Sequence, residues 1–386
     1  MEKKENLSAA IYLDNSATTK PLPEVVSAME DALEENWGNP SSLHHLGVEA
    51  EKAREKARKN IARAFGVDER EIYFSPSGTL ASNIAIGGTL LAKRRSGKHI
   101  VTTSVEHSAT WNTVQFWGTE GYSVEVVEPS IDAQDFAKEM AKSVTDETVL
   151  VTMMHVNNET GTCFPVEEAA RLCKEKNPNV TVHVDAVQSF LKIPLSLKDS
   201  SIDLLSVSAH KVHGPKGIGA LFIRKGTKIK PLLYGGGQEN GFFPGTESIP
   251  LIAGFSEAVE QLSKNTAEAY EKAKAQQKYL WNRLGEIPEV EILSPENGLP
   301  YITAFTIPGI LSENTLHFLE AKDIYVSSGS ACSKGKQSRV LAGFHLDTKR
   351  SAGYIRTSFS RFTTEEEIDA LIEGVKEAVT SLERKR

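Results

Sequence analysis

Short apolar runs separated by helical stretches constrain the fold of this chain more than any other feature of its sequence. The runs cover residues 72–74, 100–103, 149–154, 180–184 and 204–207. Just before the first run, residues 48–65 repeat apolar side chains at spacings of mostly three or four among Lys, Arg and Glu, which predicts an amphipathic helix. Strands that alternate with helices form parallel sheets covered by helices. The sequence therefore predicts an α/β fold with a mostly parallel sheet.

The pattern changes after residue 237, where a loop with Gly and Pro (235–250) is followed by a long predicted helix over about 251–285. Strand-like runs at 290–293 and 304–307 come next, and a last helix is predicted over about 364–383, with Thr364 and Glu367 as its capping box. A chain of 386 residues exceeds the usual size of one domain. We expect a large domain over residues 15–260 and a smaller α+β domain made of residues 1–14 and 261–386.

The overall composition excludes several classes of protein. The net charge of -7 disfavours a protein that binds nucleic acid over its whole surface. The charged start of the chain lacks the apolar stretch of a secretory signal, and no apolar run approaches the length of a membrane span. Three scattered cysteines fit neither a disulfide framework nor a structural zinc site. These features predict a cytoplasmic protein without a metal site, a membrane span or direct contact with nucleic acid.

A lysine and an aspartate follow two of the predicted strands. Lys211 comes shortly after the run 204–207, among small residues and glycines that would let a cofactor approach closely. A Schiff base with a carbonyl compound requires a neutral amine at some stage, although a loop lysine is usually just solvated. Asp185 ends the run 180–184, where a buried carboxylate requires a cationic partner such as a protonated pyridine nitrogen. Taken alone, an aspartate at such a place is more often a helix cap or a turn residue.

Two further strand ends add a phosphate cradle and a ring. Residues 75–79 (SPSGT) join a strand to a helical segment, and the amides there, with the hydroxyl groups of Ser77 and Thr79, suit a phosphate. His107 follows the run 100–103 and could stack on a planar cofactor, move a proton or serve only in the structure. Ligands of open α/β sheets bind at the carboxyl ends of strands. Together these strand ends suit a phosphate, a ring face, a ring nitrogen and an aldehyde, which predicts pyridoxal phosphate.

The three cysteines have different surroundings. Cys332 lies in a polar stretch rich in Ser and Gly, and the nearby Lys334 and Lys336 would raise its share of reactive thiolate. Cys163 and Cys173 lie beside apolar residues, which is typical of packing positions. Cys332 is therefore the candidate nucleophile, with an accidental exposed thiol as the alternative.

Ordered segments along nearly the whole chain carry a family resemblance. They are residues 12–19 (YLDNSATT), 38–42 (GNPSS), 155–159 (HVNNE), 183–185 (HVD), 210–211 (HK), 327–332 (SSGSAC), 355–356 (IR) and 361–367 (RFTTEEE). Together they resemble the cysteine desulfurases of the NifS type, which are pyridoxal phosphate (PLP) enzymes of fold type I in the class V aminotransferase group. The resemblance implies a large domain with a mostly parallel sheet flanked by helices and a smaller α+β domain.

The resemblance also implies a role for each matching residue. Lys211 carries pyridoxal 5'-phosphate as a Schiff base, His107 stacks on the ring as an acid or base, and Cys332 forms a persulfide. Asn158 and Arg356 hold the substrate carboxylate. Contacts to the cofactor are implied for Gly78, Thr79, His107, Asn158, Asp185, Gln188, Ser208, His210 and Lys211, and for Thr246 from the second subunit of a homodimer. The implied reaction converts L-cysteine to L-alanine and passes sulfur through the enzyme persulfide to an acceptor protein.

Two departures from the family pattern and three alternatives remain. Residues 242–246 read FFPGT where the family usually has Arg-Ser-Gly-Thr, so that Phe243 leaves the dimer-interface loop without its arginine. The segment after Cys332 reaches Val340 sooner than in housekeeping members, which bears on the choice of acceptor. The alternatives are a selenocysteine lyase, another class V activity such as an aminotransferase for small amino acids, and a cofactor-free scaffold for sulfur-relay proteins. Iron-sulfur cluster assembly and tRNA thiolation both remain open as the destination of the sulfur.

Overall fold

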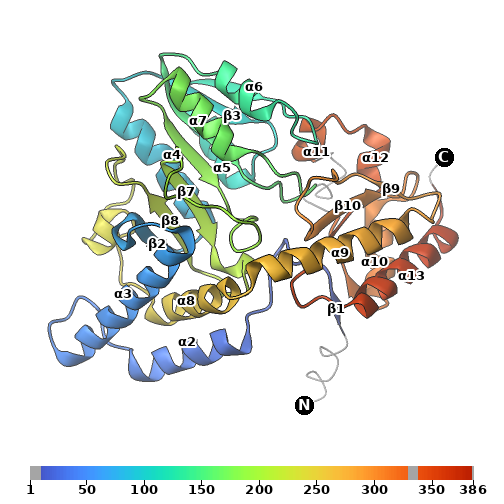
Figure 1. Ribbon diagram of the computed structural model, residues 1–386, viewed down its shortest axis with the longest axis horizontal. Helices are drawn as coiled ribbons and strands as arrows, with labels where there is room; N and C mark the ends of the chain where they lie inside the picture. Colours follow the sequence, from blue (N-terminus) through green and yellow to red (C-terminus); the bar gives the residue numbers. More distant parts are fainter. Residues whose placement is uncertain (1–9, 329–337, 385–386) are drawn as a thin grey trace.

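The computed structural model describes residues 10–328 and 338–384 of the chain. They form two parts, each with its own hydrophobic core, and the long helix α9 (Thr266–Leu284) leads from the first part into the second (Figure 1). No helix in the described part of the chain is both long and apolar enough to cross a membrane.

A twisted sheet forms the centre of the larger part. Within the described residues it has seven strands in the order β2-β8-β7-β6-β5-β3-β4. All neighbours from β7 to β4 are parallel, whereas β8 is antiparallel to both β7 and β2. The prediction of an α/β fold with a mostly parallel sheet is thus confirmed. The strands are β2 (Ile72–Ser75), β3 (His99–Thr103), β4 (Ser123–Val127), β5 (Thr148–Met154), β6 (Thr181–Asp185), β7 (Leu204–Ser208) and β8 (Gly219–Ile223).

Helices cover both faces of this sheet, because successive strand residues point to opposite sides. Leu204 packs with α4 on one face, while Leu205 belongs to the core formed with α3 and α8 on the other. The predicted helix over 48–65 is confirmed as α3, which begins three residues earlier and ends at Gly66 in a left-handed conformation. The helices of this part are α2 (Pro23–Glu35), α3 (His45–Phe65), α4 (Gly78–Lys93), α5 (Ser108–Thr119), α6 (Phe136–Lys142), α7 (Val166–Lys176) and α8 (Ile249–Ser263).

The smaller part combines an antiparallel sheet with helices. Among the described residues its strands are β9 (Glu291–Ile292), β10 (Ile302–Thr306) and β12 (Tyr354–Ser358), in the order β12-β10-β9. The first strand of the chain, β1 (Ile11–Tyr12), pairs in parallel with β11 (Ile324–Tyr325). Helices α9, α10 (Ser312–Glu320) and α13 (Glu365–Ser381) pack around them, and the predicted capping box of Thr364 and Glu367 is confirmed.

The short helices α11 (Arg339–Gly343) and α12 (Thr348–Ala352) lie in sequence within the second part. Val340 and Leu341 of α11 nevertheless pack into the larger core. The limits 15–260 and 261–386 stay predictions, since the apolar contacts of α11 cross the proposed boundary.

The predicted single helix over 251–285 is wrong, because α8 ends at Ser263 and α9 begins at Thr266. Arg361, distant in sequence, donates to the carbonyl oxygen of Leu262 at 3.0 Å and to the side chain of Asn265 at 2.6 Å. A helical carbonyl that accepts from another segment is a typical end of a helix. Residues 263–266 (SKNT), where the break lies, contain no Gly or Pro that would indicate it.

Candidate active site

The carboxyl ends of β2, β3, β5, β6 and β7 meet at one edge of the sheet, as parallel strands must. A cavity of about 750 Å³ opens at that edge and extends to β12 of the smaller part. It is lined by Gly78, Thr79, His107, Asn158, Asp185, Gln188, Ser208, His210, Lys211 and Arg356, among others. The structure therefore brings together ten of the predicted site residues. Their roles stay predictions.

Two predicted site residues are not among those that line the cavity. Thr246 is exposed on a separate loop, as a residue offered to a second subunit would be. Cys332 lies outside the described residues, although Ser327, five positions before it, lines the cavity. Cys173 is fully buried and Cys163 half-buried, and burial raises the pKa of each thiol to about 12, so neither competes as a nucleophile at neutral pH.

The start of α4 forms one end of the cavity. Ser77 caps the helix by accepting the amide hydrogen of Leu80 at 3.1 Å. A Cβ atom on Gly78 would lie 3.0 Å from Val187 and 3.3 Å from the Cβ of Ser208, so glycine lets the helix start close to the end of β7. Burial and nearby positive charges lower the pKa of His210 to about 4, which leaves a neutral ring able to donate one hydrogen bond. Free amides, hydroxyl groups and this ring fit a phosphate.

Lys211 lies in a short 3-10 helix (Ala209–Lys211) that directly follows β7. Its Nζ atom donates to the carbonyl oxygens of Ser16 and Ala17 at 2.5 and 2.8 Å. Burial lowers the pKa of Lys211 to about 8, assisted by the positive charge of Arg356 and opposed by two carboxylates. A lysine in this state supplies the neutral amine that Schiff-base chemistry needs.

Asp185 and His107 face the same cavity from two other strand ends. Burial raises the pKa of Asp185, the charges of His107 and Lys211 oppose this rise, and its Oδ1 accepts the amide hydrogen of Val187 at 3.0 Å. A buried carboxylate in this state fits a cationic ring nitrogen. His107 caps α5 by accepting the amide hydrogen of Ala109 on Nδ1 at 3.1 Å, so a neutral His107 carries its proton on Nε2.

The wall that β12 contributes to the cavity contains Arg356, whose side chain is buried. One terminal nitrogen donates to Asp14 at 2.6 Å and the other to the carbonyl oxygen of Asn158 at 2.8 Å. Its Nε atom has no hydrogen-bond partner among the described residues, and neither has Oδ1 of Asn158. Buried polar groups left without partners are expensive, so this wall fits a ligand with both an acceptor and a donor, as an amino acid has.

Sequence reasoning missed two groups of residues near the cavity. The first is the run 14–18, whose aspartate pairs with Arg356 and whose carbonyl oxygens hold Lys211. This run lies in a segment that carries the family resemblance, but its sequence predicts neither contact. The second is Lys192, which donates to Gln188 at 3.4 Å. Burial, together with the charges of Lys211 and Arg356, lowers the pKa of Lys192 to about 7. A lysine inside a Leu-Lys-Ile-Pro sequence gives no signal of this position.

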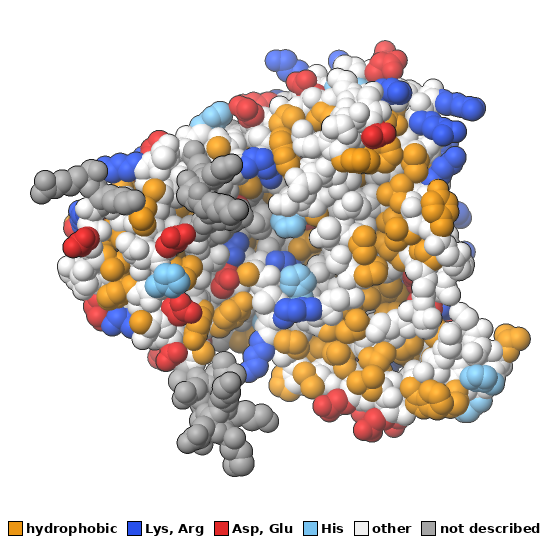
Figure 2. Space-filling model, turned by 180° about the vertical axis from the view of Figure 1, so that it is seen from behind, with side chains coloured by type: hydrophobic (Ala, Val, Ile, Leu, Met, Phe, Trp, Pro, Cys, Tyr) orange, Lys and Arg blue, Asp and Glu red, His pale blue; other side chains and the backbone are white. Residues whose placement is uncertain are grey.

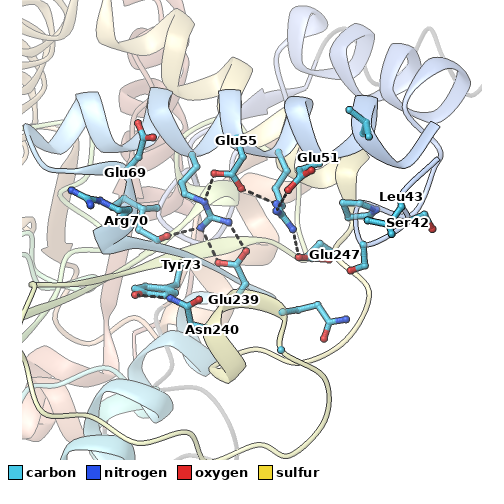
Figure 3. Close-up of a pocket in the computed structure, with 18 residues that line it drawn as sticks. Ser42, Leu43, Glu51, Glu55, Glu69, Arg70, Tyr73, Glu239, Asn240 and Glu247 are labelled. Carbon is cyan, nitrogen blue, oxygen red and sulfur yellow. Dashed lines mark hydrogen bonds and ion pairs between the residues drawn. The ribbon is translucent and has the colours of Figure 1, made fainter. Parts of the chain in front are cut away.

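A second cavity of about 610 Å³ lies between α3 and the loop that carries Thr246 (Figure 3). Arg58 pairs with Glu239 at 2.7 Å, and Arg54 pairs with Glu247 at 2.6 Å. Glu55, labelled in Figure 3, pairs with both arginines as well, at 2.9 Å with Arg54 and 3.3 Å with Arg58. These ion pairs hold the loop on both sides of the departure from the family pattern.

At that departure, Phe243 packs inward against α4 and the ends of β7 and β8. The aromatic residue therefore adds apolar packing where the family usually places a charge.

Seen from behind, histidine, basic and acidic side chains gather near the middle of the molecule, with hydrophobic ones beside them (Figure 2).

Comparison with known proteins agrees with this arrangement. The model of the family described as Aminotransferase class-V matches residues 11–371. A cysteine desulfurase of Trichormus azollae is 42% identical over 382 residues, which cover 97% of this chain and 94% of that relative. The chain belongs to the class V aminotransferase family, as a NifS-type cysteine desulfurase.

Solved structures support the same assignment. A protein described as NifS-like superposes with a TM-score of 0.91 at 35% identity and covers 97% of this chain and all of its own. A structure described as SspA in complex with cysteine gives a TM-score of 0.81 at 30% identity, covering 92% of this chain and 99% of that one. Class V aminotransferases are enzymes that work with PLP, and the donors and buried carboxylate of the cavity fit that cofactor.

Proposed function

We propose that this cysteine desulfurase holds PLP on Lys211, converts L-cysteine to L-alanine and carries the released sulfur as a persulfide on Cys332. The observation that supports the proposal best is the meeting of Lys211, Asp185, His107 and Arg356 in one cavity. Lys211 supplies an amine with a lowered pKa, and Asp185 supplies a buried carboxylate that a cation would stabilise. His107 supplies a ring nitrogen that can donate, and Arg356 supplies an Nε donor without a partner among the described residues.

The residues that would hold the cofactor occupy successive strand ends. Thr79, Ser208 and His210 would bind its phosphate at the start of α4, and Asp185 would pair with the ring nitrogen. Gln188 would contact the ring hydroxyl, with its amide nitrogen anchored on the carbonyl oxygen of Ser16 at 2.9 Å. When bound, PLP supplies an electron sink, which takes up the electron pair that remains when the α-carbon of an amino acid loses its proton.

The chain's own groups handle the substrate and its protons. Arg356 and Asn158 would orient the carboxylate of cysteine at the wall formed by β12. Lys211, with a pKa of about 8, would serve as the amine that exchanges with the substrate and as a proton acceptor at neutral pH. His107 would donate or accept a proton through Nε2, which its capping hydrogen bond on Nδ1 leaves free.

The sulfur transfer balances without an outside oxidant. The thiolate of Cys332 attacks the sulfur of cysteine, so that a sulfur-sulfur bond forms while the bond between sulfur and the β-carbon breaks. The β-carbon gains a proton and becomes the methyl group of alanine. The carbon is reduced, and the two sulfur atoms are oxidised to the persulfide level. An acceptor protein then removes the outer sulfur.

Two variants test the proposal. The purified enzyme is reduced with borohydride in the presence of PLP and digested; we expect the pyridoxyl label on the peptide that contains Lys211, and no label in Lys211→Ala. The Cys332→Ser enzyme should retain the cofactor's visible absorbance yet form no persulfide when cysteine is added. Release of sulfur from cysteine at the wild-type rate by Cys332→Ser would overturn the role of this thiol.

We further propose a cytoplasmic homodimer that delivers sulfur to an acceptor protein. Large apolar side chains are exposed near α2 and in the loops around it, and Trp37 and Leu43 are 65% and 99% exposed. A second subunit that covers these side chains would also receive Thr246. Light scattering of the full chain should give the mass of a dimer, and the Leu43→Asp enzyme should shift toward the monomer; a wild-type monomer would contradict the proposal.

A further inference from the structure

The described residues on either side of Cys332 are fixed to the wall of the cavity. On the near side, the backbone of Ser327 exchanges two hydrogen bonds with Arg356, at 3.0 and 2.7 Å. On the far side, Ser338 donates from Oγ to the buried Oε2 of Glu159 at 2.8 Å. Glu159 follows Asn158 directly, and its carbonyl oxygen accepts from the hydroxyl group of Tyr354 at 2.8 Å. Both ends therefore rest on residues next to the predicted substrate carboxylate site.

Arg339 adds a second attachment on the far side. Its guanidinium carbon lies 4.4 Å from the centre of the Trp111 ring, a cation-π distance. Its two terminal nitrogens donate to the carbonyl oxygens of Ser104 and Glu106. These carbonyls belong to the turn between β3 and α5, the turn that also carries His107.

We propose that Arg339, stacked on Trp111 and bonded to the turn before His107, is a positioning residue that fixes the far end of the Cys332 segment relative to the active site. Lysine could not reproduce the arrangement, since only a planar guanidinium stacks on a ring while its separate nitrogens reach two carbonyl oxygens. Arg339 does not line the cavity, so it acts through Cys332 and not on the substrate. The inference rests on the proposed role of Cys332.

The attachment also has a precise steric fit. A Cβ atom on Gly343, at the end of α11, would lie 2.8 Å from the side chain of Ser104 and 3.1 Å from that of Val105. The helix that begins at Arg339 therefore packs closely on the same turn. Val340 and Leu341 anchor it in the larger core, so loss of the Arg339 contacts should loosen the start of α11 without unfolding the helix.

Single-turnover persulfide formation tests the proposal. Enzyme loaded with PLP is mixed with one equivalent of cysteine, quenched at intervals, and the persulfide on Cys332 is measured by mass spectrometry. We expect Arg339→Met to slow this step by about 10- to 100-fold, since misplacement of a reacting group by about 1 Å costs as much as 100-fold. The KM for cysteine and the cofactor absorbance should not change. Arg339→Lys should recover only part of the rate.

A matched control is Arg283→Met, which removes another arginine stacked on an aromatic ring, 5.6 Å from Tyr279 in α9. It should form persulfide at the wild-type rate. If Arg339→Met fails to fold, Trp111→Leu removes the stacking partner and should slow the same step. Persulfide formation at the wild-type rate in Trp111→Leu or in folded Arg339→Met overturns the positioning role. Persulfide formation by Cys332→Ser would instead overturn the proposed function itself.

Discussion

The ion pair between Arg58 and Glu239 gives the sharpest test of how the loop with Thr246 is held (Figure 3). The two side chains are 11% and 2% exposed, and Arg58 reaches both carboxylate oxygens, at 2.9 and 2.7 Å. The same carboxylate accepts the amide hydrogen of Phe74 at 2.7 Å. Glu239→Ala therefore leaves a buried guanidinium and a buried amide without this partner. Loss of one member of a buried pair costs about 3–5 kcal/mol in the free energy of unfolding.

Urea unfolding of the full chain with bound PLP measures this loss. The double variant Arg58→Met/Glu239→Leu should recover most of it, because apolar residues replace the buried pair. The control is Glu69→Gln, which removes an exposed carboxylate 3.9 Å from Lys59 and should change stability by less than about 1 kcal/mol. The reasoning is refuted if Glu239→Ala is no less stable than Glu69→Gln. It is also refuted if the double variant loses as much free energy of unfolding as Arg58→Met and Glu239→Leu lose when their separate losses are added.

Three further predictions concern the site itself. Burial raises the pKa of Glu106 from 4.5 to about 8, so the folded enzyme loses stability as pH rises between these values. The Tm of Glu106→Gln minus the Tm of the wild type should therefore increase up to about pH 8. A Tm difference that does not change with pH would contradict this. Arg356→Lys should raise the KM for cysteine roughly tenfold or more without affecting PLP uptake, and an unchanged KM would exclude the carboxylate contact. Gly78→Ala should weaken PLP binding in a fluorescence titration, whereas Gly237→Ala, whose Cβ meets nothing within 4 Å, should not; equal affinities would refute the steric argument.

The sheet and most of its site could be predicted because both follow from local patterns. Asp185 and Lys211 each come at the end of an apolar run, and the carboxyl ends of parallel strands share one edge. Their meeting in one cavity therefore needed no knowledge of long-range contacts. The helix around 48–65 and the capping box at Thr364 were equally local signals.

The remaining features depend on contacts between distant segments. Asp14 reaches Arg356 only because β1 joins the smaller part, and Arg361 ends α8 from a position 99 residues away. No periodicity or motif encodes such a partner. Strand β8 was also not predicted. It runs antiparallel between two strands and follows β7 without a helical crossover, so the alternation of strands and helices does not indicate it.

Phe243 shows how the structure changes the meaning of a departure. From the sequence alone, Phe243 takes the place of the arginine that the family usually has in a loop expected at a subunit interface. In the fold it is 6% exposed and packs on α4, while Arg54 and Arg58 of α3 hold the loop by its glutamates. The loop is thus held from within its own subunit.

The central claim is that sulfur passes from cysteine to Cys332 in an enzyme that holds PLP on Lys211. Its most direct test is a single turnover with cysteine carrying a heavy sulfur isotope, followed by digestion and mass spectrometry without reductant. We predict one heavy sulfur on the peptide that contains Cys332, one alanine per labelled site, and no label in Lys211→Ala. Heavy sulfur on Cys163 or Cys173, or alanine formed without labelled Cys332, would contradict the account.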